Sequence, residues 1–308
     1  MGSFVTTNNQ QPTTVFMNYR ITHTTTYTYS DPVSFCYNIA RLGIRNAEGQ
    51  FSRGSFISIH PQPDVINEYE DFYGNKVIYF AIQHEHRSLT VIVSSEVTRD
   101  EVNKLETGLD DGMPWEVLKE QLSQRNTELL EVKQFITDTP VTAANEDIRQ
   151  YALRSFTSGR SVLEALQDLM HRIHNNFTFN PGFTTVATPA LDVFYAGRGV
   201  CQDFAHLAIA CIRSVGLPAR YVSGYIETIP PPGYEKLVGV DASHAWFSSY
   251  IPGIGWVDFD PTNDVIPSSQ HITIGWGRDY FDIAPLKGVI LSSGSHHLAV
   301  SVDMRRIS

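Results

Sequence analysis

The first third of the chain alternates apolar and polar side chains, which is the two-residue period of half-buried β-strands. The alternation begins with Val15, Met17, Tyr19 and Ile21. Two further strands are predicted over 55–60 and 89–93, and Gly74-Asn75 between two apolar runs indicates a hairpin. Short strands separated by turn signals predict a small β-sandwich or barrel.

After residue 98 the apolar positions follow a helical period. One helix is predicted after Pro114 and another over 145–156. A third begins at Ser161, where Glu164 completes a capping box. Its apolar positions are Val162, Leu166, Leu169, Met170 and Ile173. They form one stripe, so this helix is predicted to cover a core.

The last third combines both periods. A helix is predicted to begin at Cys201, directly after a loop that contains Gly197 and Gly199. Its apolar stripe consists of Phe204, Leu207, Ala208 and Cys211. Strands are predicted over 219–227, 244–250 and 255–260. The last third is therefore predicted to contain both helices and strands.

This pattern divides the chain into four parts. We expect a flexible tail over 1–14, an N-terminal β domain over 15–97 and a charged, helical connector over 98–140. The remainder, 141–308, is expected to form a core of helices and strands that includes the C-terminal strands.

Composition excludes several classes of protein. The 308 residues carry a net charge of −10, which argues against a nucleic-acid partner. The chain holds no apolar run of the roughly 20 residues that a membrane helix needs, so no membrane partner is expected. Three cysteines without a CxxC pair favour a reducing compartment. With no secretory signal at the N-terminus, we expect a cytoplasmic protein.

Cys201 is the first candidate for chemistry. A cysteine at the start of a helix lies near partial positive charge and free N–H groups, which favour the thiolate. The alternative is a buried small residue, the usual fate of a free cysteine. Cys211 lies on an apolar stripe and Cys36 lies in the β region, so both are expected to be structural.

A base and a group to orient it are predicted on the hairpin. In an antiparallel hairpin the residue numbers of every directly paired couple add up to the same total. If Tyr250 pairs with Ile254, that total is 504, and the numbers of His244 and Asp260 also add up to 504. In that register the two residues lie directly opposite one another, close enough for an imidazole–carboxylate hydrogen bond. Taken singly, His244 could be a surface histidine and Asp260 a turn residue before Pro261.

Three ordered blocks resemble the core of the transglutaminase-like superfamily in its bacterial branch. They are GVC before a helix, HAW on a strand and WVDFDPT on the next strand, with GLPARYV between the first two. The segments YRITHTTTYTY and DFYGNKV are similar to the β domain that precedes this core in many bacterial members. GWGRDYFDIAPLKGVI is similar to their C-terminal segment. The resemblance implies an α+β fold in which residues 141–308 form a papain-like catalytic core, with the cysteine helix packed on an antiparallel sheet.

The resemblance implies Cys201 as nucleophile, His244 as base and Asp260 as the residue that orients it. It therefore implies a thiol-dependent amide hydrolase or acyltransferase that acts through a thioester on a protein or peptide, with an amine as a possible acceptor. Gln202 and Trp246 are candidate second donors to the oxyanion. Asp203 is expected to stabilise the start of the helix. A catalytically silent binding module is the alternative.

No cofactor and no metal are expected. The paired histidines His84/His86 and His296-His297 have no Cys or carboxylate at ligand spacing. Nothing in the sequence resembles the calcium sites of the animal members.

Overall fold

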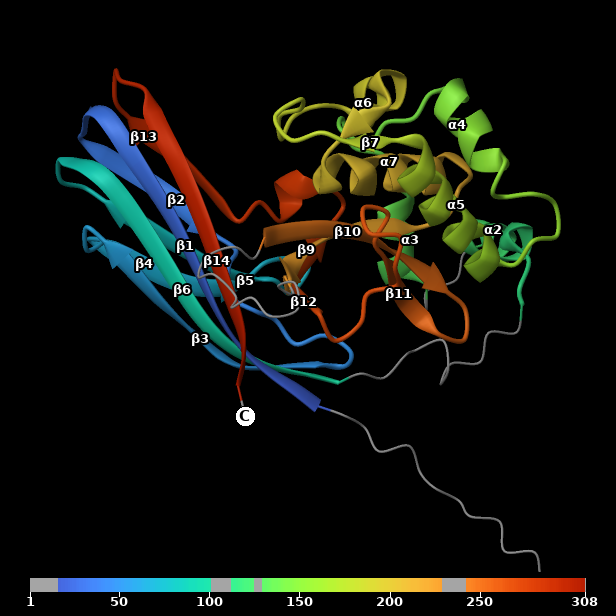
Figure 1. Ribbon diagram of the computed structural model, residues 1–308, viewed down its shortest axis with the longest axis horizontal. Helices are drawn as coiled ribbons and strands as arrows, with labels where there is room; N and C mark the ends of the chain where they lie inside the picture. The colour runs from blue at the N-terminus through green and yellow to red at the C-terminus, as the bar shows by residue number, and fades with distance from the viewer. Residues whose placement is uncertain (1–15, 101–111, 125–128, 229–241, 308) are drawn as a thin grey trace, which may run out of the picture.

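The computed structural model describes residues 16–100, 112–124, 129–228 and 242–307. Figure 1 shows a β-rich region beside a region in which helices cover a sheet. The predicted tail lies outside the described residues. The strands are β1 (Phe16–Val33), β2 (Phe35–Ala40), β3 (Gln50–His60), β4 (Val65–Glu70), β5 (Lys76–Ile82), β6 (His86–Asp100), β7 (Thr178–Phe179), β8 (Arg198–Gly199), β9 (Ala219–Ile226), β10 (Ala242–Ile251), β11 (Gly255–Phe259), β12 (His271–Gly277), β13 (Leu286–Leu291) and β14 (His296–Ile307).

The α-helices are α2 (Trp115–Ser123), α3 (Leu130–Lys133), α4 (Glu146–Leu153), α5 (Val162–Asn176), α6 (Ala190–Ala196) and α7 (Cys201–Ser214), and short 3₁₀ turns are η1 (Gln134–Ile136) and η2 (Tyr280–Asp282). None of the helices in these ranges is long and apolar enough to cross a membrane. The predicted cap of α5 is present, since the Ser161 side chain accepts from the Glu164 backbone N–H at 3.2 Å.

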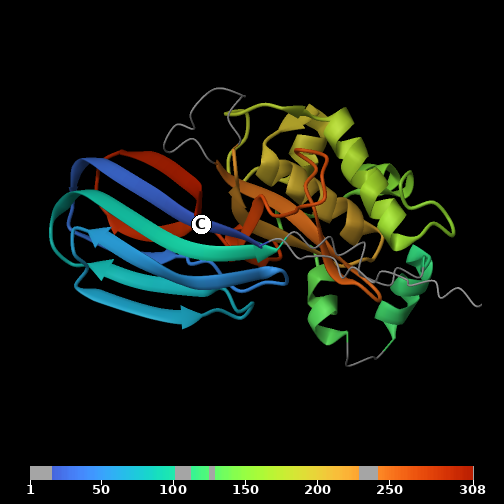
Figure 2. The same cartoon turned by 60° about the horizontal axis from the view of Figure 1, so that its bottom comes forward.

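The N-terminal region is a sandwich of two four-stranded antiparallel sheets, ordered β14-β1-β6-β3 and β13-β2-β5-β4 (Figure 2). The predicted hairpin is β4 and β5. Inward-facing residues of both sheets form one apolar cluster, which includes Val33, Phe80, Ile82, Leu89 and Val91. The α+β class with an N-terminal sandwich is confirmed.

The second region consists of the sheet β11-β10-β9-β12 with helices packed on it. Helix α7 lies against β9 and β10, and every residue from Asp203 to Arg213 on it is buried. An amphipathic helix has one apolar stripe, but this helix is enclosed on all sides because α4, α5 and α6 also contact it. The cysteine-bearing end of α7 is therefore held from several directions.

Two of the predicted domain limits differ from the structure. Strands β13 and β14 were expected in the core over 141–308, but they pair with β2 and β1 of the sandwich. Without them, the edges of β1 and β2 would leave a row of unpaired backbone groups. The described helices of the segment predicted as a connector over 98–140 are part of the core, because Trp115, Leu118 and Val132 belong to the core cluster around α7.

The two regions are joined through the edge strand β12. The side-chain amide of Gln50 donates to the Thr273 carbonyl and accepts from the Thr273 N–H, both at 2.8 Å. Asn75 does the same for Trp276, at 2.8 and 3.0 Å. These amides satisfy backbone groups that an edge strand otherwise leaves open. An apolar cluster that includes Tyr19, Ile21, Tyr225, Ile272 and Met304 completes the contact.

Candidate active site

Cys201 is the first residue of α7 and is partly exposed. The turn before it is held by Asp203, which is 1% exposed and accepts from the Val200 N–H at 2.8 Å and from the Thr184 hydroxyl at 2.6 Å. A Cβ on Gly199 would lie 2.7 Å from the Asp203 Oδ2. Only glycine leaves room for the Asp203 carboxylate at position 199. The glycine of the GVCQD segment is therefore explained by the close packing of the Asp203 side chain against the backbone before Cys201.

His244 on β10 and Asp260 just after β11 form a buried hydrogen bond, with Nε2 2.7 Å from Oδ2. The predicted register is wrong by two residues. Ile251 pairs with Gly255, so the paired residue numbers add up to 506, and Gly253 and Gly255 adopt positive φ in the turn. Because the side-chain period of a strand is two, this shift keeps both residues on one face as diagonal neighbours, and the side chains still meet.

Asp260 is fully buried and accepts five hydrogen bonds. Besides His244, the donors are the backbone N–H groups of Thr262 and Asn263, the Asn263 side chain at 2.7 Å and His271 Nε2 at 3.1 Å. His271, the first residue of β12, was missed by the sequence analysis. A single histidine at the start of a strand, eleven residues from its partner, carries no local signal in the sequence.

The electrostatics favour a charged His244–Asp260 pair. Burial opposes the imidazolium, but the hydrogen bonds to Asp260 and to the Cys201 thiol outweigh it and raise the pKa of His244 to about 10. Burial likewise raises the pKa of Asp260, but its hydrogen bonds with His244 and His271 hold that pKa well below 3.8. The structure thus brings the Cys201 thiol, the His244 imidazole and the Asp260 carboxylate together.

The remaining predicted residues lie around this group. Gln202 donates to the Val186 carbonyl at 3.1 Å. Trp246 is fully buried, its ring centroid lies 6.1 Å from that of His244, and its indole N–H has no hydrogen-bond acceptor among the described residues. Cys36 and Cys211 are both buried, as expected for structural cysteines.

Three ligand atoms, from His244, Asp260 and His271, lie within 4.8 Å of one another. Two imidazoles and a carboxylate are a donor set that divalent metals accept. A metal would have to displace the hydrogen bonds that Asp260 now makes to both rings. The expectation that the protein needs no metal stays a prediction.

The fold and this arrangement define a class: an N-terminal β-sandwich followed by an α+β core, in which a helix-start cysteine meets a histidine and an aspartate. Comparison with protein families agrees. Residues 19–98 match the bacterial transglutaminase-like N-terminal region, and residues 149–261 match the transglutaminase-like superfamily core. The chain belongs to the transglutaminase-like superfamily.

The chain is also similar over nearly its whole length to curated bacterial proteins. It is 38% identical to an uncharacterized protein of Mycobacterium tuberculosis, covering 93% of this chain and 92% of that protein. It is 33% identical to an uncharacterized protein of Mycobacterium leprae, covering 94% and 99%. A crystal structure from Cytophaga hutchinsonii, described as a "Putative Cysteine Protease", has a TM-score of 0.74 at 21% identity and covers 96% of this chain and 92% of its own. That likeness shows the shared fold.

Proposed function

We propose that the protein is a thiol-dependent amide hydrolase or acyltransferase with Cys201 as nucleophile, His244 as base and acid, and Asp260 as the orienting carboxylate. The observation that carries the proposal is the buried 2.7 Å His244–Asp260 hydrogen bond, and Cys201 lies near enough to help raise the pKa of the same imidazole. Membership of a superfamily of cysteine-dependent hydrolases and acyltransferases supports it.

The proposed reaction begins with the thiolate–imidazolium pair. His244 Nε2 is hydrogen-bonded to Asp260, so Nδ1 is the nitrogen available to Cys201. The Cys201 sulfur attacks the carbonyl carbon of an amide, and the imidazolium gives its proton to the leaving amine as the C–N bond breaks. The resulting thioester reacts with water to give an acid, or with a primary amine to give a new amide, and the thiol is released.

Stabilising the oxyanion needs donors that are already in place. The Cys201 backbone N–H at the start of α7 is the natural first donor, because the first N–H groups of a helix have no intrahelical acceptor. The buried Trp246 indole N–H, which is beside His244 and unused, is the better candidate for the second. The Gln202 side chain is already bonded to Val186.

The substrate class is a protein or peptide amide. A segment of this chain is 31% identical, over 33% of its length, to the protein-glutamine gamma-glutamyltransferase of Pseudomonas aeruginosa, of which it covers 16%. That protein's name supports a glutamine side chain as one acyl donor. The described cysteines are all free, which suits a reducing compartment, and a cytoplasmic location stays a prediction that cell fractionation tests.

Labelling of the thiol tests the nucleophile. Iodoacetamide at neutral pH should modify Cys201 rapidly, as located by peptide mapping, and Cys201→Ala should remove this fast phase. Cys211→Ala, which changes a fully buried thiol on the same helix, should keep it. Equally fast labelling of the Cys201→Ala protein would overturn the assignment.

A second experiment separates the two reactions. The protein is incubated with a glutamine-containing protein library, with and without a labelled primary amine, and mass spectrometry reports incorporated amine, cleaved chains or neither. Amine incorporation indicates an acyltransferase, and cleavage indicates a protease. A rapidly labelled Cys201 with neither product, across both arms, would favour the alternative of a catalytically silent binding module.

A further inference from the structure

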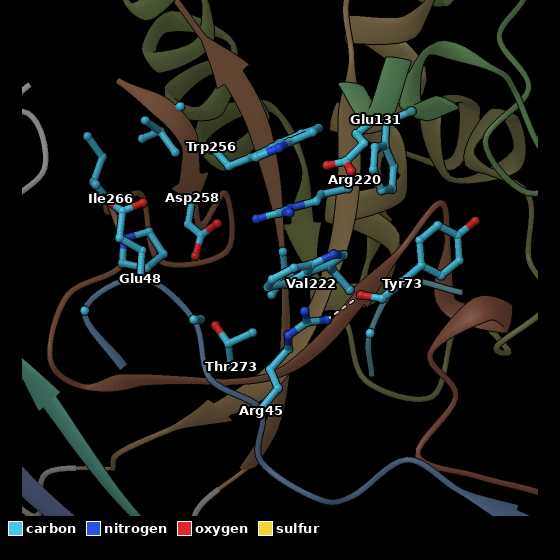
Figure 3. A pocket seen from close by; sticks show the side chains of 18 of the residues that line it. Arg45, Glu48, Tyr73, Glu131, Arg220, Val222, Trp256, Asp258, Ile266 and Thr273 are labelled. Atoms are coloured by element: carbon cyan, nitrogen blue, oxygen red, sulfur yellow. Dashed lines mark hydrogen bonds between the residues drawn. The ribbon is translucent and has the colours of Figure 1, made fainter. Parts of the chain in front are cut away.

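A cavity of about 1040 Å³ lies between the sandwich and the core sheet, and none of Cys201, His244 and Asp260 lines it. Figure 3 shows Arg45 and Tyr73 entering it from the sandwich side and Arg220, Trp256 and Asp258 from the core. Its volume is at the upper end of the range of ligand sites. The cavity is therefore large enough to hold a small molecule or a short peptide.

Cations and aromatic rings alternate along one wall of the cavity. The Arg45 Cζ lies 3.3 Å from the ring centroid of Trp276. The Arg220 Cζ lies 3.9 Å from the Trp276 centroid and 4.3 Å from that of Trp256. Stacking of this kind engages the faces of a guanidinium and leaves its N–H edge free to donate.

Arg220 differs from Arg45 in what that edge contacts. Arg45 donates to the Tyr73 carbonyl at 2.9 Å and to the Asn75 side chain at 2.7 Å. Arg220 is 8% exposed, yet it has no hydrogen bond or ion pair within the described part of the chain, and its Nε is buried without an acceptor. A buried guanidinium with unused donors is costly unless something else accepts from it.

The register of the sheet explains why Asp258 does not serve as that acceptor. Arg220 pairs with Ser248 on β10, and Ser248 pairs with Asp258 on β11. The two charged residues are thus two strand spacings apart, roughly 10 Å between backbones. Asp258 acts on Arg220 through space, and the Ser248 hydroxyl between them also has no partner among the described residues.

The charges around the cavity limit what can bind to Arg220. Three arginines line it together with four acidic residues; these are Arg45, Arg99, Arg220, Glu48, Asp100, Glu131 and Asp258. The lining is therefore slightly negative, which disfavours a dianionic phosphate. A carboxylate carries a single charge, and its two oxygens match the N–H edge of a guanidinium.

We propose that this cavity binds a ligand through a carboxylate group that accepts from the free edge of Arg220, with Trp256 and Trp276 as flanking walls. The carboxylate comes either from the C-terminus of a peptide or from a free small organic acid. Ile266, Pro267 and Ser268 of the segment that joins Asp260 to His271 also line the cavity, so an occupant touches the loop whose ends carry the active-site network.

Binding is tested on full-length protein that carries Cys201→Ala, so the result does not depend on thiol chemistry. The probes are N-acetyl-trialanine with a free C-terminus, the same peptide as its C-terminal amide, succinate and inorganic phosphate. We expect a carboxylate probe to shift the indole N–H resonances of Trp256 and Trp276 saturably. The amide should shift neither resonance. A preference for the peptide or for succinate identifies the source of the carboxylate.

Two variants assign the binding to Arg220. Arg220→Met should weaken binding of the carboxylate probe at least ten-fold. Arg220→Lys keeps the charge but loses the two parallel N–H donors of the guanidinium, so it should weaken binding as well. Arg154→Met changes an exposed arginine that caps the C-terminus of α4 and does not line the cavity, and it should leave binding unchanged. Without probe, Arg220→Met should melt at or above the parent temperature, because the buried guanidinium that it removes has no hydrogen-bond or ion-pair partner among the described residues.

Four results would overturn the proposal. These are equal binding of the peptide and its amide, tighter binding of phosphate than of either carboxylate, no binding of any probe at millimolar concentration, and a lower melting temperature for Arg220→Met without probe. The last would mean that the stacked guanidinium is purely structural. None of these four results depends on whether Cys201 is alkylated in the wild-type protein, so failure of this proposal can be told apart from failure of the proposed function.

Discussion

Two buried charges on the same core sheet have opposite environments. Asp260 is fully buried and accepts five hydrogen bonds, from two rings, one amide and two backbone N–H groups. Arg220 is 8% exposed and has none among the described residues. A buried charged group whose hydrogen-bonding capacity is fully used holds its neighbours in one geometry. A buried charged group without hydrogen bonds can still bind a ligand. The contrast separates a site built to orient a base from a site built to receive a ligand.

The largest effect is expected from Asp260→Asn. In the amide one carboxylate oxygen becomes an NH₂ donor, which then faces either the two rings that now bond Oδ2 or the Thr262 and Asn263 N–H groups that now bond Oδ1. The imidazolium also loses its negative partner, so the alkylation rate should fall by about 10³–10⁴-fold. Removing one member of a buried charged network should also lower the free energy of unfolding by roughly 3 kcal/mol. Rates of turnover or Cys201 alkylation, and urea denaturation, measure the two effects.

Arg220→Met is the matched control for stability, because it removes a charge of similar burial on the same sheet. The different environments of the two charges require opposite outcomes: a marked loss of unfolding free energy for Asp260→Asn and no loss for Arg220→Met. Equal losses of unfolding free energy in the two variants would show that the number of hydrogen bonds does not distinguish the two positions.

The pH dependence of stability follows from the same pair. Since the folded pKa of His244 is raised from 6.5 to about 10, its contribution is complete below pH 6.5, declines above it and is gone above about pH 10. The pKa of Asp260 is lowered from 3.8, so its contribution is present above that value and is lost as the pH falls. The wild type should therefore exceed Asp260→Asn in stability most strongly between about pH 4 and 6.5.

Thermal unfolding of both proteins from pH 3 to 11 measures this difference. A stability gap that is independent of pH across that range would contradict a charged His244–Asp260 pair in the folded protein.

A smaller effect is expected from His271→Phe. The phenyl ring can still pack against Trp246, whose centroid lies 5.4 Å from that of His271, but the 3.1 Å hydrogen bond to Asp260 is lost. A hydrogen bond to a charged group contributes about 1.5 kcal/mol or more, so the rate of Cys201 alkylation should fall about ten-fold. His297→Phe, at an exposed position of β14, should leave the rate unchanged. An unaltered rate in His271→Phe would remove His271 from the orienting network.

Local signals in the sequence were sufficient for the elements that carry the site. The capping residues of α5, the start of α7 at Cys201 and the hairpin of β10 and β11 were all predicted from neighbouring residues. Their catalytic roles stay a prediction. The register was missed because turn conformation at Gly253 and Gly255 sets it, and composition alone does not fix which residue of a Gly-rich turn pairs first.

Features that depend on contacts between residues far apart in the sequence could not be predicted from local patterns. The return of β13 and β14 to the sandwich depends on which strand edges remain open after the rest has folded. Arg220 was predicted as an ordinary residue of the strand over 219–227, and His271 lies where no strand was predicted. What distinguishes these two residues is the set of side chains around them on neighbouring strands. Those neighbours are distant in the sequence and meet only in the folded protein.

The smallest effect on the thiol site is expected from a change at the junction that shapes the cavity. Gln50→Ala leaves the N–H and the carbonyl of Thr273 without the side-chain amide that now satisfies both at 2.8 Å, and Gln50 is only 4% exposed. Buried backbone groups left unpaired should lower the free energy of unfolding by about 1–3 kcal/mol. Gln83→Ala, at an exposed position where only the backbone is bonded, should cost nothing measurable. Because Thr273 lines the cavity and Cys201 does not, Gln50→Ala should weaken binding of the carboxylate probe while leaving the rate of Cys201 alkylation near that of the wild type. A fall in both together would show that the cavity and the thiol site are one unit, and the contrast between Asp260 and Arg220 would then describe two ends of a single site.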